Sequence, residues 1–190
     1  MRVFAALTPP ATAIDHLEHA LLGVRRDDVE WRWVLPDRWH LTLAFYGEVS
    51  EFTADRVALR LERVAGRQAP LQLCFAGVGA FDRPSRARVI WAGVRTIADD
   101  GSLARLADRC RAAGRRAGVT MPQTDRGFRA HLTLARARTN PVDARGFLAA
   151  LAGYTGPVWT ATHLQLIRSF LGPVPRYETL GSWPLSDGAS

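Results

Sequence analysis

One octapeptide organises this chain: His40-Leu41-Thr42-Leu43-Ala44-Phe45-Tyr46-Gly47. Its first five residues recur word for word at His131-Leu132-Thr133-Leu134-Ala135. Fewer than roughly one sequence of this length in a hundred should contain such a repeat by chance. Alternating leucine and threonine favour a β-strand. The two copies therefore predict two equivalent strands in a fold with approximate internal duplication.

On a strand, successive side chains point to opposite faces. In each copy the histidine and the threonine should therefore share one face, and the leucines should share the other. The same alternation places Tyr46 on the histidine face, where it could touch a ligand. It places Phe45 and Arg136 on the leucine face, so Arg136 could reach a ligand only from the end of the strand or past a bulge. The predicted polar face consists of His40, Thr42, His131 and Thr133.

Three interpretations of this polar face compete. The simplest is that histidine and threonine occupy half-exposed strand positions, but two identical copies argue against it. A zinc site needs three or four ligands, and neither copy has a carboxylate or cysteine close by on the same face. The third is metal-free acid–base catalysis on a phosphate, in which one neutral imidazole takes a proton and the other, charged, gives one. The threonine hydroxyls, about 6.6 Å along each strand, would hold phosphate oxygens.

The composition suits a globular protein: 47% of the 190 residues are hydrophobic and 23% are charged. The N-terminal apolar run is too short for a signal peptide before Pro9 and Pro10 interrupt it, and no run has the roughly 20 apolar residues of a membrane span. Cys74 and Cys110 lack the spacing of a metal or redox motif. We therefore expect a cytoplasmic protein.

The net charge of +7 does not by itself indicate nucleic-acid binding. All 25 basic residues are arginine, and composition alone could account for them. Their distribution says more than their number. Residues 83–145 hold 14 arginines and 5 acidic residues, whereas the rest of the chain is slightly acidic. The middle of the chain is thus either a phosphate-attracting surface or a solvated helix face.

Hydrophobic periodicity and capping residues predict alternating strands and helices. Helices are expected at about 10–23, after Ser50, after Asp99-Asp100 and from Asp143, and a loop is expected at 120–128. Besides the two repeats, strands are expected at 2–7, 31–35, 71–78, 88–94, 158–167 and 177–185. This order predicts an α+β fold. A pseudo-two-fold arrangement of two lobes would bring the two polar faces to a shared cleft.

With its two His-x-Thr motifs, the chain resembles the 2H phosphoesterase superfamily, and within it the bacterial RNA 2′,3′-cyclic phosphodiesterases, also called RNA 2′-5′ ligases or LigT-like proteins. The resemblance covers nearly the whole chain. Its flanking parts are Arg2-Val3-Phe4-Ala5-Ala6-Leu7, Arg88-Val89-Ile90-Trp91, Ser169, Tyr177 and Trp183-Pro184-Leu185. It implies a single bilobal domain over residues 1–190, with an antiparallel sheet in each lobe, helices outside and a metal-independent site in the cleft.

The resemblance also implies roles for individual residues. His40 and His131 match the family's catalytic histidines, and Thr42 and Thr133 match its phosphate-binding threonines. Arg136 matches the arginine that closes the second motif and contacts phosphate. Tyr46 and Tyr177 are candidate substrate-binding residues, although family members often carry leucine where Tyr46 stands.

The implied activity is hydrolysis of a 2′,3′-cyclic phosphate on RNA ends or nucleotides, which leaves a 2′-phosphate. By the same resemblance His40 is the acid and His131 the base. RNA 2′-5′ ligation at the same site and a non-catalytic nucleotide- or RNA-binding module are the alternatives. We expect a monomer that needs no cofactor or metal and does not associate with membranes.

Overall fold

The structure is a computed structural model that describes residues 1–25, 30–121, 127–172 and 175–187. Strands and helices alternate along the chain, which confirms the predicted α+β class. In order they are β1 (Arg2–Leu7), α1 (Ala11–Leu22), β2 (Trp31–Trp33), η1 (Pro36–Arg38), β3 (Leu41–Glu48), α2 (Glu51–Ala65), β4 (Leu71–Phe81), η2 (Pro84–Arg86), β5 (Val89–Thr96), α3 (Ser102–Arg116), β6 (His131–Ala137), α4 (Arg145–Ala150), β7 (Trp159–Ala161), β8 (His163–Phe170) and β9 (Arg176–Pro184).

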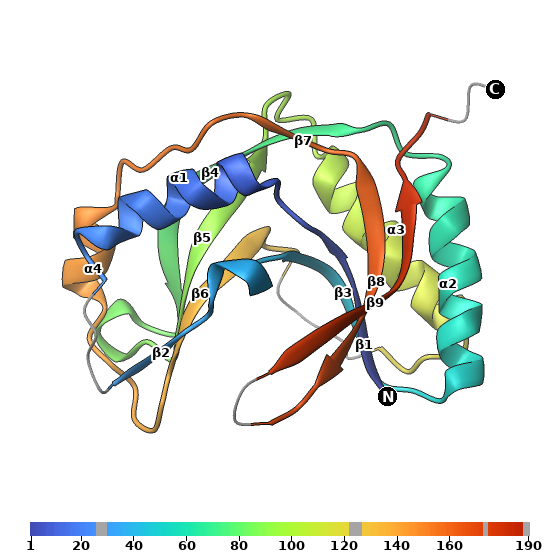
Figure 1. Ribbon diagram of the computed structural model, residues 1–190, viewed down its shortest axis with the longest axis horizontal. Helices are drawn as coiled ribbons and strands as arrows, with labels where there is room; N and C mark the ends of the chain where they lie inside the picture. The colour runs from blue at the N-terminus through green and yellow to red at the C-terminus, as the bar shows by residue number, and fades with distance from the viewer. Residues whose placement is uncertain (26–29, 122–126, 173–174, 188–190) are drawn as a thin grey trace.

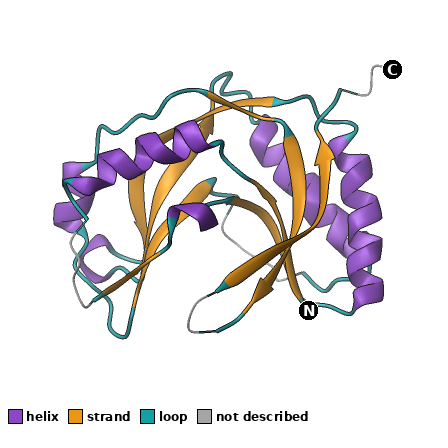
Figure 2. Ribbon diagram, in the orientation of Figure 1, coloured by secondary structure: helices purple, strands orange, loops and turns teal. Residues whose placement is uncertain are grey.

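The strands pair antiparallel in a curled sheet whose order is β7-β4-β5-β6-β3-β1-β8-β9, with β2 also paired to β6 (Figures 1 and 2). We call β3, β1, β8 and β9 the β1 half, and β6, β5, β4, β7 and β2 the β5 half. The two halves meet where Leu41 of β3 pairs with Leu132 of β6. The predicted lobes thus each carry an antiparallel sheet, and the two repeat strands join them.

Helices cover the face of the sheet opposite the histidines. α3 packs on β3, and α2 packs on α3, β8 and β9. The side chain of Ser50 accepts a hydrogen bond from the backbone N–H of Thr53, as expected for the residue that begins α2. On the other half, His16 of α1 hydrogen-bonds to Tyr154, which follows α4. The helix after β1 therefore crosses to the β5 half, and the helix after β5 crosses to the β1 half.

Both repeat strands contain a bulge at the same place. In β3, Thr42 and Ala44 pair with the adjacent Ala6 and Ala5 of β1, which leaves Leu43 as an extra residue. A bulge shifts the alternation by one residue, so side chains beyond it change face. The prediction that Phe45 lies on the leucine face is therefore wrong.

Tyr46 does not lie on the histidine face, where simple alternation predicts it. Its side chain is 4% exposed, and its hydroxyl donates a hydrogen bond to the backbone oxygen of Cys110 in α3 at 3.0 Å. Phe45 instead lies on the histidine face, because it pairs with Phe4, whose ring stacks on His40. The substrate-binding role predicted for Tyr46 is thus contradicted, since the residue packs under α3.

β6 contains the equivalent bulge, and it brings Arg136 onto the histidine face. Thr133 and Ala135 pair with the adjacent Trp91 and Ile90 of β5, and Leu134 is the extra residue. Arg136 therefore returns to the face of Thr133 instead of lying with the leucines. Arg136 was predicted to reach a ligand either from the end of the strand or past a bulge, and the structure shows a bulge.

The predicted strand at 158–167 is two strands. β7 pairs with β4 at the edge of the β5 half, whereas β8 pairs with β1 in the other half. The chain changes halves at Thr162, whose carbonyl accepts a hydrogen bond from the backbone N–H of Leu185. A single straight strand could not pair with both halves of a curled sheet. The loop predicted at 120–128 lies partly outside the described residues.

None of the described helices combines the length and the apolar character needed to cross a membrane.

The contact between Tyr46 and α3 gives a stability prediction. A Cβ at Gly114 would lie 2.6 Å from Cε1 of Tyr46, whose ring is buried and cannot move aside. Overpacking costs about 1–3 kcal/mol, which exceeds the gain of about 1 kcal/mol from alanine in a helix. We expect Gly114→Ala to lower the free energy of unfolding, measured by chemical denaturation.

Gly146→Ala in α4 is the matched control, because no atom lies within 4 Å of the added Cβ. This variant should be neutral or more stable by up to about 1 kcal/mol. If Gly114→Ala stabilised the protein as much as Gly146→Ala, the close packing of Tyr46 against α3 would be contradicted.

Candidate active site

The pair Leu41–Leu132 places the two polar motifs beside each other. Both leucines are fully buried, so the residues on either side of each leucine point to the opposite face. Continuing the antiparallel register by one residue sets His40 opposite Thr133 and Thr42 opposite His131. A pseudo-two-fold axis thus passes between the leucines, and the predicted gathering of the four polar side chains agrees with the backbone pairing.

Each imidazole is held by the carbonyl two residues before it. Nδ1 of His40 lies 2.8 Å from the oxygen of Arg38, and Nδ1 of His131 lies 2.7 Å from the oxygen of Arg129. A carbonyl oxygen can only accept, so Nδ1 carries a proton and donates in both rings. Nε2 is then the nitrogen of each ring that can exchange a proton with a ligand.

Aromatic side chains pack around His40. The ring of Phe4 stacks on the imidazole with centroids 4.7 Å apart, and Tyr177 contacts it edge-on at 5.2 Å. Phe4, Ala6 and Ile167 form a small buried cluster on this face, separate from the main core, and Tyr177 packs against it. The position of His40 is therefore fixed by one hydrogen bond and two ring contacts.

A similar arrangement surrounds His131. Phe81 contacts its imidazole edge-on with centroids 4.8 Å apart, and Trp91 lies at 6.1 Å. The guanidinium of Arg129 lies over the ring of Trp91 at 5.4 Å. A Cβ at Gly79 would lie 2.2 Å from the ring of Trp91, so the indole rests directly on this glycine. Each histidine thus has its own aromatic support from neighbouring strands.

Arg136 contributes positive charge to both halves of the site. Its charge lowers the pKa of both His40 and His131. The pKa of Arg136 itself is lowered, first by desolvation and then by Arg32 and Arg2, while Tyr177 opposes the shift. Arg32 pairs with Arg136 between β2 and β6, and Arg2 lies over the ring of Phe45 at 4.5 Å. None of these three arginines forms an ion pair among the described residues, so an anion could neutralise them.

Burial is the main influence on both imidazoles. Desolvation lowers the pKa of His40 and of His131, because the charged form loses hydration. The hydrogen bond to the carbonyl raises each pKa and opposes this effect only in part. Both rings therefore favour the neutral form near neutral pH, and a bound phosphate would favour the charged form.

The structure places the predicted site residues as follows. Arg136 lies on the histidine face, and Tyr177 touches His40, whereas Tyr46 is on the opposite side of the sheet. Several residues around the histidines were missed, because most of them lie on other strands and only the strand register brings them there. They are Arg2, Phe4, Arg32, Phe81, Trp91 and Arg129. The internal symmetry was the signal that could have found them, since Phe4 and Trp91 lie in the strands that flank the two repeats.

No cluster of three or more histidine, cysteine, aspartate or glutamate side chains suited to a metal occurs among the described residues. The polar groups that face one another are two imidazoles, two hydroxyls and guanidinium groups. Such a set can transfer protons and bind the oxygens of an anion.

Comparison with known proteins identifies relatives that are phosphoesterases. Residues 7–91 match the family model described as LigT like Phosphoesterase. An RNA 2′,3′-cyclic phosphodiesterase of Thermus thermophilus is 33% identical over 97% of this chain and 90% of its own length. One of Archaeoglobus fulgidus is 39% identical over 57% of each chain. The crystal structure of the Thermus thermophilus protein TT0787 covers all of both chains with a TM-score of 0.80 and 30% identity.

Some curated relatives match over only part of their length, and in four of them the matched region spans about half of the relative. The Thermus thermophilus phosphodiesterase, in contrast, matches nearly end to end, and its alignment includes both His-x-Thr repeats. This full-length similarity, together with the shared fold, leads to one conclusion. The chain belongs to the family of LigT-like phosphoesterases, which are 2H phosphoesterases.

Proposed function

We propose that this protein hydrolyses 2′,3′-cyclic phosphates at RNA ends or on nucleotides, without a metal, by acid–base catalysis with His40 and His131. The observation that carries the proposal is the pairing of the two repeats at Leu41–Leu132, which directs both His-x-Thr motifs to one face. The name that the curated relatives share, RNA 2′,3′-cyclic phosphodiesterase, supports the choice of substrate. A single bilobal domain of residues 1–190, acting as a monomer, supplies every group.

The reaction needs two proton transfers. In the proposed step, Nε2 of His131 takes a proton from water while the water oxygen attacks phosphorus. The bond between phosphorus and the 3′ oxygen breaks, and His40 donates its Nε2 proton to that oxygen. The product is a 2′-phosphate, with His40 now neutral and His131 charged. The order of the two roles rests on the family resemblance.

The phosphate carries negative charge that grows on its outer oxygens as water attacks. We propose that the hydroxyls of Thr42 and Thr133 donate hydrogen bonds to these oxygens and that Arg136 binds them with its guanidinium group. Preorganised donors of this kind stabilise the transition state more than the ground state. The bulge at Leu134 supports this role for Arg136, because it turns the side chain to the histidine face.

Tyr177 is proposed to contact the substrate beside His40. Its ring meets His40 and Phe4 edge-on, with centroids 5.2 and 5.7 Å away. An aromatic ring in this position offers a surface for a ribose or a base. The role predicted for Tyr177 thus remains a proposal, in contrast to that of Tyr46.

The two histidines provide the first test. We expect His40→Ala and His131→Ala each to lower the rate of hydrolysis of a cyclic mononucleotide by on the order of 10²-fold or more, because each removes one proton transfer. Substrate binding should persist in both variants. His16→Ala is a suitable control, because His16 contacts Tyr154 on the outer surface. Near-normal turnover by either active-site variant would contradict the two-histidine mechanism.

The pH dependence provides the second test. One imidazole must be neutral and the other charged, so kcat/KM should follow a bell. Burial and Arg136 lower both pKa values in the free protein. The midpoint of the bell should therefore lie below the unperturbed value of about 6.5.

Arg136→Gln removes a positive charge that disfavours both imidazolium forms. We expect it to raise both histidine pKa values, to move the bell to higher pH and to lower the maximal rate. Arg138→Gln, an exposed change of the same charge two residues further along, is the control. The pKa values of both imidazoles are measured by NMR titration. If neither pKa changed in Arg136→Gln, the proximity of Arg136 to the histidines would be contradicted.

The third test concerns the metal and the bond that breaks. Because Thr42, Thr133 and Arg136 can offset the phosphate charge, activity should survive EDTA. Phosphorus NMR of the product from a cyclic mononucleotide should show a 2′-phosphate. A 3′-phosphate would overturn the assignment of the leaving oxygen, and loss of turnover in EDTA would overturn the metal-free site. Adding an RNA with a 5′-hydroxyl end to the same assay measures ligation.

A further inference from the structure

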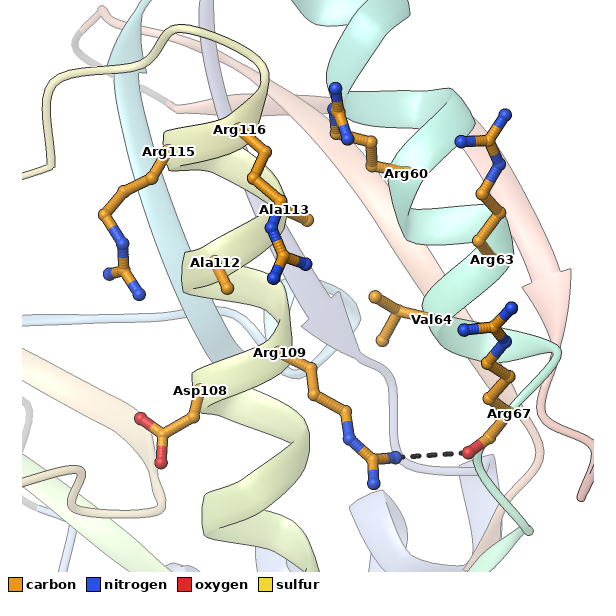
Figure 3. Close-up of a pocket in the computed structure, with 10 residues that line it drawn as sticks. All are labelled: Arg60, Arg63, Val64, Arg67, Asp108, Arg109, Ala112, Ala113, Arg115 and Arg116. Atoms are coloured by element: carbon orange, nitrogen blue, oxygen red, sulfur yellow. Dashed lines mark hydrogen bonds between the residues drawn. The ribbon is translucent and has the colours of Figure 1, made fainter.

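A second basic surface lies away from the histidines, in a groove between α2 and α3 (Figure 3). The groove has a volume of about 750 Å³, within the usual range of ligand sites. Its floor is made of small apolar side chains, among them Ala112 and Ala113, so the groove stays open between the helices. We call it the α2–α3 groove.

Arginines form both walls of this groove, and they come from the C-terminal parts of the two helices and the turn after α2. Arg67 and Arg109 face each other at one end, and Arg60 and Arg116 lie at the other (Figure 3). Arg109 and Arg116 are seven residues apart on α3, so the row extends about 10.5 Å along the helix. The six arginines of the groove are Arg60, Arg63, Arg67, Arg109, Arg115 and Arg116.

These charges are not neutralised by acidic side chains of the described chain. Asp108 is the acidic residue that lines the groove, and it already forms an ion pair with Arg111. None of the six arginines forms an ion pair among the residues that the structure describes. Within the described parts of the chain, Arg109 hydrogen-bonds to oxygens of Arg67 and Gln68. Six like charges around one groove repel each other unless an anion binds there.

The groove draws its arginines from two parts of the sequence. The basic segment at 83–145 contributes three of the arginines, but Arg60, Arg63 and Arg67 come from a region that is not basic overall. Folding therefore concentrates positive charge beyond what the segment alone supplies. Helix dipoles favour arginine near each helix C-terminus. That effect would account for one or two arginines per helix, but not for a row of arginines on both sides of a groove.

We propose that the α2–α3 groove binds the phosphate backbone of RNA at a distance from the RNA end that is processed. Guanidinium groups bind phosphate through paired hydrogen bonds, and a row of them suits evenly spaced phosphates. The choice of RNA as the partner rests on the proposed function. The groove lies on the helix side of the sheet, opposite the histidines, so it adds a second contact for long RNA and none for a mononucleotide.

The test compares two triple variants of equal charge. Arg63, Arg67 and Arg116 are exposed, and their side chains form no hydrogen bond in the described structure, so R63Q/R67Q/R116Q should fold normally. R95Q/R105Q/R145Q removes three exposed arginines outside the groove. Binding is measured by fluorescence anisotropy with a single-stranded RNA of about a dozen nucleotides that ends in a 3′-hydroxyl and cannot be hydrolysed. The KM for a cyclic mononucleotide is measured separately.

We expect the groove variant to bind the RNA on the order of tenfold more weakly and to lower the slope of log K against log salt by about 2, since each phosphate contact contributes about 0.7. DNA of the same length should respond equally, because only phosphates are contacted. The control variant should change little, and the mononucleotide KM should not change in either. Equal losses in both triple variants, or groove-dependent binding to anionic lipid vesicles but not to RNA, would overturn the proposal.

The two proposals fail in different ways. Wild-type protein that binds RNA through the groove but does not turn over the cyclic mononucleotide would contradict the proposed function alone. Normal turnover with RNA binding that is indifferent to the groove arginines would contradict the groove alone.

Discussion

The site depends on one backbone contact, the antiparallel pairing of Leu41 with Leu132. This pair joins the two halves of the sheet and lies on the pseudo-two-fold axis between the repeats. Because both leucines are buried on the helix side, their neighbours must point to the other side, and the register sets each histidine opposite the threonine of the other repeat. A shift of the pairing by one residue would turn every one of these side chains to the wrong face. The function and the fold therefore share one constraint.

The surroundings of the histidines follow from the same pairing. Each repeat strand has a neighbour that brings an aromatic ring beside its histidine, Phe4 from β1 and Trp91 from β5. Each imidazole is also held through Nδ1 by the carbonyl two residues before it. Burial lowers the pKa of both imidazoles, the carbonyl hydrogen bonds oppose this shift in part, and the contacts together fix the orientation of Nε2. Preorganisation is thus achieved by ordinary strand pairing and packing, without any strained backbone at the histidines.

The sequence was sufficient to predict the four polar residues, because a repeated His-x-Thr pattern carries both the strand period and the chemistry. It was sufficient for the α+β class and for most helices, where capping residues and apolar spacing agree. It failed for Tyr46 and Phe45, because nothing in an alternating pattern reveals a bulge. It also failed for the strand at 158–167, because the change from one half of the sheet to the other depends on pairing partners. The supporting aromatic residues were missed for the same reason, since strand register sets them next to the histidines, although the internal symmetry pointed to the strands that carry Phe4 and Trp91.

Because the same bulge occurs in both repeats, equivalent positions of the two halves can be compared, and some of them carry different residues. The residue five positions after each histidine lies on the histidine face, and it is Phe45 in one half and Arg136 in the other. A cyclic phosphate has two inequivalent ribose oxygens, and a perfectly symmetric pair of histidines could not distinguish them. The distinction must come from positions where the two halves differ. Arg136 places a guanidinium group on the β5 half where the β1 half presents an apolar ring with Arg2 over it. Duplication therefore accounts for the pair of proton-transfer groups, and divergence at positions such as this one makes the two halves of the site inequivalent.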